Sequence, residues 1–137
     1  MILLDTSGLL AALMPSQHRH DDAREALEAE AGRLVISPFV LAEVDYFVGK
    51  WAGVEVEATL LSEVVNGAYE LATFEAEDVG EARDVIEAYP KLRIGLADAS
   101  IVVLAERLQT RRVLTLDRRH FGALRTRAGK PFELLPG

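Results

Sequence analysis

Short apolar runs alternate along the chain with longer segments in which apolar residues recur at helical spacing. The first run, Met1 to Leu4, has no polar break, which is typical of a strand buried on both faces of a sheet. Four further strands are predicted at residues 33–36, 69–72, 112–116 and 132–135. The predicted helices are 8–13, 16–31, 39–51, 54–66, 75–89 and 96–108. Strands separated by helices imply a three-layer α/β fold, with a central, mainly parallel sheet flanked by helices on both faces.

Local signals support several of these boundaries. Thr6 and Ser7 are favourable N-cap residues for the first helix. Ser37 followed by Pro38 indicates the start of the third helix, because proline is favoured in the first turn. The chain contains no repeat, linker or low-complexity segment. We therefore expect a single domain over residues 1–137.

Composition narrows the possible classes of protein. Half of the 137 residues are hydrophobic, which provides for a buried core and argues against disorder. The absence of cysteine excludes disulfides, thiol catalysis and cysteine-bound zinc. No apolar run approaches the roughly 20 residues of a membrane span. Met1 already belongs to the first strand, so no cleavable signal is expected. These features predict a cytoplasmic protein.

Charge is distributed unevenly along the chain. The net charge of −7 disfavours contact with nucleic acid, but residues 107–130 hold eight basic residues and one acidic residue. A basic C-terminal segment beside an acidic body is compatible with phosphate binding at one edge. Arg112, Arg118 and Arg119 are the candidates for such contacts, including contacts to RNA. The same arginines could instead pair with the many glutamates of a solvated surface.

Two aspartates follow predicted strands. Asp5 comes directly after the first strand, and Asp117 directly after the strand 112–116. In open α/β sheets, ligand sites lie where the carboxyl ends of the strands meet. Thr115 lies two residues before Asp117 on the same face of its strand, where it could donate a hydrogen bond to a carboxylate or a metal-bound water. Each aspartate alone could also be an ordinary turn or cap residue.

Glu43 lies on a predicted helix among aromatic residues. Its neighbours at helical spacing are Phe39, Tyr46 and Phe47. We therefore expect its carboxylate to be at least partly buried and to need a compensating cation, since an unpaired buried charge is costly. The alternative partner is an arginine in a salt bridge. Asp45 points elsewhere on the same helix and is expected to be solvated.

A fourth carboxylate, Asp98, lies in the first turn of the helix 96–108, where it also favours the helix dipole. If the four carboxylates converge, their repulsion would raise carboxyl pKa values unless divalent cations neutralise them. Oxygen ligands without cysteine or paired histidine suit Mg²⁺ or Mn²⁺ and disfavour zinc. His18 and His20 are expected at the surface. His120 could touch a substrate phosphate or serve in capping or packing.

Four segments of the chain resemble the acidic motifs of PIN domains, in particular those of VapC toxins from bacterial toxin–antitoxin pairs. They are LLDTS (3–7), SPFVLAEV (37–44), GLADA (95–99) and LTLDRRHF (114–121). Each motif is weak alone, but their order and spacing are specific, and the resemblance covers the whole chain. By position, the family's acidic quartet corresponds to Asp5, Glu43, Asp98 and Asp117. The supporting polar residues correspond to Thr6 and Thr115. Where some relatives have another acidic residue after the third motif, this chain has Ser100.

The resemblance implies a PIN-like fold and a Mg²⁺-dependent endoribonuclease, with Mn²⁺ as a possible substitute, that cuts a structured RNA such as tRNA or a ribosomal RNA loop. Metal ions held by the quartet would activate a water and neutralise charge on the leaving oxygen. Glu43 or Asp117, where not needed as a ligand, could position or deprotonate that water.

The resemblance also implies two protein partners, a cognate VapB-like antitoxin and a second copy of the chain in a homodimer. An antitoxin arginine could pair with the carboxylates and displace metal. Its apolar residues could cover a groove formed by Phe47, Trp51, Val54 and Leu61. These four residues could instead form core and a homodimer interface.

Two other functions fit part of the pattern. An aspartate after the first strand also suggests a metal-dependent phosphatase with an aspartyl nucleophile. That chemistry needs a second aspartate where this chain has Ser7, and a lysine shortly before Asp117, where there is none. A non-catalytic α/β signalling or scaffold domain leaves Glu43 on its aromatic face unexplained. Hydrolysis of a phosphomonoester, cleavage of folded RNA, or inactivity on both would distinguish the three.

Overall fold

The computed structural model describes residues 1–137. Its five strands form one parallel sheet in the order β3-β2-β1-β4-β5. They are β1 (Ile2–Leu4), β2 (Leu34–Ile36), β3 (Glu70–Leu71), β4 (Arg112–Leu114) and β5 (Glu133–Leu135). Each strand lies within one of the strand ranges predicted from the sequence. The predicted parallel sheet is therefore confirmed.

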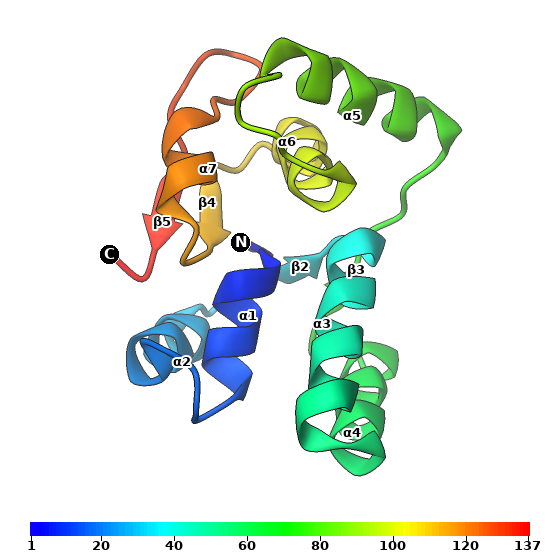
Figure 1. Cartoon of the computed structure of the whole chain (residues 1–137), viewed down its shortest axis with the longest axis vertical. Helices are drawn as coiled ribbons and strands as arrows, with labels where there is room; N and C mark the ends of the chain where they lie inside the picture. Colours follow the sequence, from blue (N-terminus) through cyan, green and yellow to red (C-terminus); the bar gives the residue numbers. More distant parts are fainter.

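Seven helices surround the sheet. They are α1 (Thr6–Leu13), α2 (His20–Ala29), α3 (Pro38–Ala52), α4 (Val54–Val65), α5 (Ala76–Ala88), α6 (Leu96–Leu108) and α7 (Arg118–Ala123). Helices α1 and α2 lie on one side of the sheet and α5 and α6 on the other, whereas α3 and α4 form a pair that extends away from it (Figure 1). The three-layer arrangement is thus confirmed. Helix α7 was not predicted, because its six residues are too few for a periodic pattern. No helix is both long and apolar enough to cross a membrane.

The core is centred on β1. Ile2, Leu3 and Leu4 are at most 1% exposed, because β1 is the middle strand and helices cover both of its faces. This explains why its sequence has no polar break. At the start of α3, Ser37 Oγ accepts a hydrogen bond from the Phe39 backbone N–H at 3.1 Å, as its predicted capping role requires.

The strand order reverses at β1. Strands β2 and β3 follow on one side of β1, and β4 and β5 on the other. The register pairs Leu4 with Leu114, and the Asp5 backbone N–H donates to the Leu114 carbonyl at 3.0 Å. Such a reversal leaves a crevice outside the carboxyl ends of the strands, where α/β proteins bind ligands. The topology therefore places Asp5 beside the residues that follow β4.

Helix α1 approaches the end of β4 very closely at Gly8. A Cβ atom on Gly8 would lie 2.3 Å from the Leu114 carbonyl oxygen and 2.8 Å from the Thr115 backbone nitrogen. These are backbone atoms, so they cannot move aside as a flexible side chain could. The absence of a side chain at Gly8 thus allows the first turn of α1 to lie directly against the end of β4.

Two predicted boundaries near this contact are wrong. Helix α1 begins at Thr6 with Asp5 in the N-cap position, so Thr6 and Ser7 are not its caps. Strand β4 ends at Leu114 rather than at residue 116, so Asp117 follows a short turn instead of a strand. Asp117 is the N-cap of α7. Thr6 and Ser7 instead make contacts with residues far away in the sequence, whereas Asp117 caps a helix that the sequence did not predict.

Candidate metal centre

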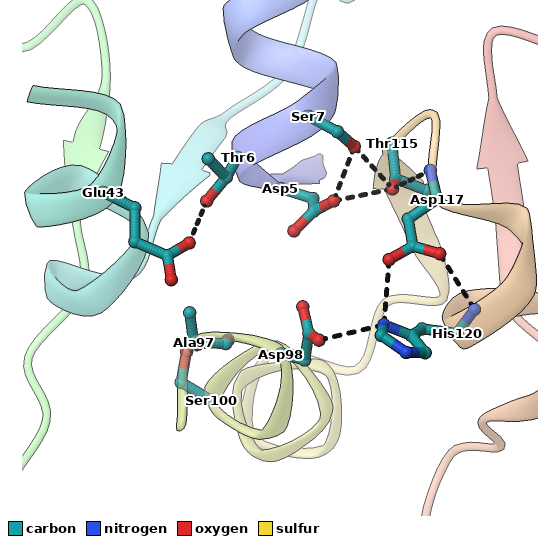
Figure 2. A network of polar contacts seen from close by, with 10 residues as sticks. All are labelled: Asp5, Thr6, Ser7, Glu43, Ala97, Asp98, Ser100, Thr115, Asp117 and His120. Atoms are coloured by element: carbon teal, nitrogen blue, oxygen red, sulfur yellow. Dashed lines mark hydrogen bonds and ion pairs between the residues drawn. The ribbon is translucent and has the colours of Figure 1, made fainter. Parts of the chain in front are cut away.

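A cavity of about 420 Å³ opens outside the carboxyl ends of β1 and β4, and all four carboxylates predicted from the sequence line it. Asp5 follows β1 and Glu43 projects from α3, while Asp98 lies in the first turn of α6 and Asp117 in the turn before α7. Figure 2 shows their side chains directed toward a common centre. The structure therefore brings together four residues that are far apart in the sequence.

Asp5 is the most buried member of this set, at 4% exposure. Its Oδ2 accepts hydrogen bonds from Thr115 Oγ1 at 2.7 Å and from Ser7 Oγ at 2.9 Å. Burial raises the pKa of the Asp5 carboxyl above its usual value, although these two hydrogen bonds act in the opposite direction. The prediction that Thr115 donates to a carboxylate is confirmed. The second oxygen of Asp5 faces the centre of the site (Figure 2).

The hydroxyls of Ser7 and Thr115 connect α1 to the turn after β4. They lie 3.2 Å apart. Ser7 Oγ also accepts from the Leu116 backbone N–H at 3.0 Å, and Thr115 Oγ1 accepts from the Asp117 backbone N–H at 2.9 Å. Asp5 and Asp117 are thereby held in a defined relative position. The sequence interpretation missed this role of Ser7, because it treated the residue as a helix cap.

Glu43 is exposed, so the prediction of a partly buried carboxylate is wrong. The buried positions of α3 are Val40, Val44 and Val48, and Glu43 lies beside this apolar face rather than on it. Its Oε1 accepts a hydrogen bond from Thr6 Oγ1 at 2.6 Å. Thr6 thus supports a quartet residue, and it orients the Glu43 side chain toward the cavity (Figure 2).

The aromatic residues near Glu43 do not cover it. Phe39 packs edge-on against Phe74, with ring centroids 5.1 Å apart. Asp45, expected to be solvated, is instead half-buried, and it raises the pKa of Glu57 on α4 mainly through a side-chain hydrogen bond. The assignment of buried and solvated carboxylates on α3 was therefore reversed. Helical spacing identified the neighbours correctly but not the direction in which their rings pack.

Asp98 and Asp117 share His120 as a neighbour. His120 Nδ1 lies 2.9 Å from Asp117 Oδ2 and 3.4 Å from Asp98 Oδ2. Burial, followed by the charge of Asp5, raises the pKa of Asp98 to about 7, whereas His120 acts to lower it. The sequence left the role of His120 open between phosphate contact, capping and packing. Helix α7, which was not predicted, turns the chain after Asp117 so that His120, three residues later, lies beside the Asp117 carboxylate.

The donor groups fit a divalent cation. Ligand atoms of Asp98, Asp117 and His120 all lie within 4.8 Å of one another. No lysine or arginine is among the thirteen residues that line the cavity, so no side-chain cation of these types compensates the carboxylates there. The four carboxylates that line the cavity supply oxygen atoms, which are typical ligands of Mg²⁺ and Mn²⁺.

Arg112, the first of the candidate RNA contacts, does not line the cavity. Arg112 begins β4, at the end of the strand opposite the cavity, and its guanidinium pairs with Glu30. It also donates to the Met1 carbonyl oxygen at 3.4 Å. The guanidinium of Arg112 is thus engaged in ion pairs within the chain and lies away from the cavity. The pairing joins residues 82 positions apart, so local sequence could not reveal it.

Arg118 and Arg119 lie beside the cavity, at the start of α7 and directly after Asp117. Both are exposed. Arg118 Nη2 donates to the Pro136 carbonyl oxygen at 3.0 Å, and Arg119 makes no ion pair within the chain. Both side chains are therefore accessible from solvent, and the guanidinium of Arg118 also has a partner within the chain.

The remaining polar residues near the motifs have other roles. His18 is exposed at the rim of the cavity, whereas His20 is half-buried, with Nδ1 2.7 Å from the Ala11 carbonyl oxygen. Ser100 is fully buried and lies 2.7 Å from Ser37 Oγ, which connects α6 to the start of α3. Ser100 does not line the cavity, so it contributes no fifth ligand.

Comparison with known proteins agrees with this geometry. Residues 2–125 match the PIN domain family. Ribonuclease VapC26 of Mycobacterium tuberculosis is 44% identical over 135 residues, which cover 98% of this chain and 100% of that protein.

Two solved structures share the fold. The crystal structure of Mycobacterium tuberculosis VapC20, a sarcin-ricin loop cleaving toxin, matches with a TM-score of 0.79 and 15% identity, over 85% of this chain and 90% of that one. FitAcB from Neisseria gonorrhoeae matches with a TM-score of 0.54 and 19% identity, over 80% and 83% of the two chains. With a family match along most of its length and a curated relative of this identity, the chain belongs to the PIN-domain family and is a ribonuclease of the VapC type.

Proposed function

We propose that this protein is a Mg²⁺-dependent endoribonuclease toxin that cleaves a structured RNA, such as a tRNA or a ribosomal RNA loop. The observation that carries the proposal is the convergence of four carboxylates in a cavity lined by no lysine or arginine. A divalent cation bound there supplies activation of a water and neutralisation of charge at the scissile phosphate. The fold shared with VapC20, a toxin that cleaves the sarcin-ricin loop, supports ribosomal RNA as one candidate substrate.

Each member of the quartet has a distinct proposed role. Asp5, Asp98 and Asp117 would hold the cation. Ser7 and Thr115 both donate to Asp5 Oδ2, which leaves the other oxygen of Asp5 free to face it. These hydroxyls also keep the Asp5 carboxylate in one orientation, so little rearrangement is needed for binding.

Glu43 is the proposed general base. Its Oε1 is held by Thr6, which leaves Oε2 available to orient a water and accept its proton. Asp117 is less suited to this role, because Oδ1 accepts from the His120 backbone N–H and Oδ2 lies against the His120 ring. Between the two bases considered from the sequence, the hydrogen bonds therefore favour Glu43.

Purified protein incubated with total RNA and Mg²⁺ tests the proposal. We expect new RNA 5′ ends at one or a few positions in a structured RNA, and no cleavage in excess EDTA. Full cleavage in EDTA would contradict a metal-dependent nuclease. Hydrolysis of a small phosphomonoester without RNA cleavage would favour the aspartyl phosphatase instead.

The exposed arginines beside the cavity are proposed to bind phosphates that flank the cleaved bond. The double variant Arg118→Ala/Arg119→Ala is expected to bind RNA more weakly, and its affinity should depend less on salt, because each lost phosphate contact lowers the log–log slope by about one. Filter binding at several salt concentrations measures this slope. The matched control is Arg83→Ala on α5, whose exposed side chain pairs with Asp84. A slope equal to that of the control would show that the pair faces solvent only.

We also propose a cognate VapB-like antitoxin and a homodimer as protein partners. Trp51 and Phe47 line the same cavity as the carboxylates, and their rings lie 4.8 Å apart, so an apolar wall adjoins the acidic centre. An antitoxin tail could place apolar residues on this wall and an arginine among the carboxylates. Further exposed apolar side chains on α4, with Val54 at 76% and Val65 at 85%, are proposed to pack in the homodimer.

Co-expression with the neighbouring gene product tests the antitoxin. We expect co-purification and relief of toxicity. Changing the tail arginine to alanine should weaken inhibition at least about tenfold, since a charge-assisted bidentate pair with a carboxylate is lost. Undiminished inhibition by that variant would show that the carboxylates are not its target. The matched control changes an antitoxin arginine outside the tail.

A further inference from the structure

We propose that His120 is itself a ligand of the bound cation, so that the site has a mixed nitrogen and oxygen donor set that favours Mn²⁺ over Mg²⁺. This inference rests on the proposed function, because it concerns the same cavity. It differs from the oxygen-only donor set that was expected from the sequence. The donors concerned are Asp98 Oδ2, Asp117 Oδ2 and His120 Nδ1.

The spacing of these three atoms is that of neighbouring ligands. Nδ1 lies 2.9 Å from the Asp117 oxygen and 3.4 Å from the Asp98 oxygen. Adjacent ligands of an octahedral ion with bonds of about 2.0–2.1 Å are about 3 Å apart. The first turn of α7 maintains this arrangement, because the His120 backbone N–H donates to Asp117 Oδ1 at 3.0 Å. The imidazole and the carboxylate are therefore held on the same side of the helix.

The orientation of the His120 ring relative to the Asp117 carboxylate indicates a metal ligand rather than a hydrogen-bond donor to Asp117. His120 Nδ1 is buried from solvent, yet it makes no hydrogen bond, although the Asp117 oxygen is 2.9 Å away. Its N–H or lone pair therefore does not point along the line to that oxygen. Two ligands of one ion behave in this way, because their lone pairs converge on the ion rather than on each other. A cation between these atoms would satisfy the otherwise unpartnered nitrogen.

The donor set has a consequence for metal preference. Mg²⁺ favours oxygen ligands and keeps several waters, whereas imidazole nitrogen suits transition ions. Mn²⁺ accepts both carboxylate and imidazole ligands. An imidazole ligand at His120, in place of a further oxygen, should therefore raise the affinity for Mn²⁺ more than that for Mg²⁺.

Mn²⁺ binding to the RNA-free protein tests the inference without reference to activity. Electron spin echo spectroscopy of bound Mn²⁺ should detect coupling to an imidazole nitrogen, and His120→Ala should remove it. We expect His120→Ala to lower Mn²⁺ affinity by about tenfold to a hundredfold. Loss of a residue that holds a metal ligand in place already has an effect of this size. Mg²⁺ affinity, measured by competition, should change by less than about threefold, because Mg²⁺ depends mainly on oxygen ligands. The matched control is His18→Ala, which removes an exposed imidazole from the rim of the same cavity.

His120→Asn provides a second variant in case alanine disturbs α7, and it should also lose the nitrogen coupling while retaining the fold. Absence of nitrogen coupling in the unmodified protein would overturn the inference. So would equal or tighter Mn²⁺ binding by His120→Ala, which would make His120 a counter-ion that competes with the metal. If Mg²⁺-dependent RNA cleavage persists in either case, only this inference fails. If the protein binds no divalent cation, the proposed function fails as well.

Discussion

Replacing Asp98 by asparagine is expected to abolish RNA cleavage and, at the same time, to stabilise the metal-free protein at pH 8. Loss of a metal ligand removes several kcal/mol of transition-state stabilisation, which corresponds to a decrease in rate of about a thousandfold or more. The opposite effect on stability arises because Asp98 is partly buried beside Asp5 and Asp117 and, in the folded chain, has a pKa of about 7. A neutral amide at this position removes the repulsion.

The pH dependence of stability tests whether the charge of Asp98 is the cause of this stabilisation. The pKa of Asp98 rises from its ordinary value of 3.8 to about 7 in the folded protein, so the folded state binds the proton more tightly than the unfolded chain does. The tighter binding of this proton by the folded state contributes to stability at about pH 4, and this contribution is lost as the pH rises to 7. The Asp98→Asn variant should therefore be more stable than the parent protein, with the largest difference above pH 7 and a smaller one toward pH 4. Thermal unfolding in EDTA at several pH values measures it.

Asp21→Asn is the matched control, because Asp21 is an exposed aspartate in the first turn of α2. If Asp98 served only the dipole of α6, both variants would lose about 0.3–1 kcal/mol of stability and both would cleave RNA. Full cleavage by Asp98→Asn, or a loss of stability like that of Asp21→Asn, would contradict the metal site.

Gly8→Ala is expected to lower both stability and activity, although Gly8 carries no functional group. The added Cβ would meet the backbone of Leu114 and Thr115 at 2.3 to 2.8 Å, so α1 must move away from β4. Overpacking of this kind costs about 1–3 kcal/mol. A displacement of about 1 Å would also separate Asp5 from Thr115 and decrease cleavage about a hundredfold. Denaturant unfolding and single-turnover cleavage measure the two effects.

Gly80→Ala is the matched control for this substitution. Gly80 lies inside α5, and a Cβ there would meet nothing within 4 Å. Alanine should therefore stabilise the helix by about 1 kcal/mol and leave cleavage unchanged. Unchanged stability and activity in Gly8→Ala would show that α1 and β4 can separate at no cost, and that their close approach does not position the site.

Local sequence was sufficient to identify the main elements and the set of carboxylates. Helix α6 has the predicted bounds, and β1 is buried on both faces as its unbroken apolar run indicated. Asp5 and Asp117 converge because parallel strands direct their carboxyl ends to one edge. These features follow from the periodicity of side chains along the backbone, which neighbouring residues determine. Glu43 and Asp98 were singled out from their places on predicted helices, and the family resemblance then supported all four carboxylates through the order of four motifs.

How the side chains are used depends instead on packing between distant elements. Glu43 was expected to be at least partly buried and is exposed, and the ring of Phe39 packs against Phe74 instead. Arg112 pairs with Glu30 and Ser7 contacts Thr115, and these partners lie 82 and 108 positions apart in the sequence. Sequence periodicity reports only the face of a single element, so it cannot show which elements meet or which side chains pair. The environments of Asp98 and His120 likewise exist only once α6 and α7 are brought together at the reversal of the sheet.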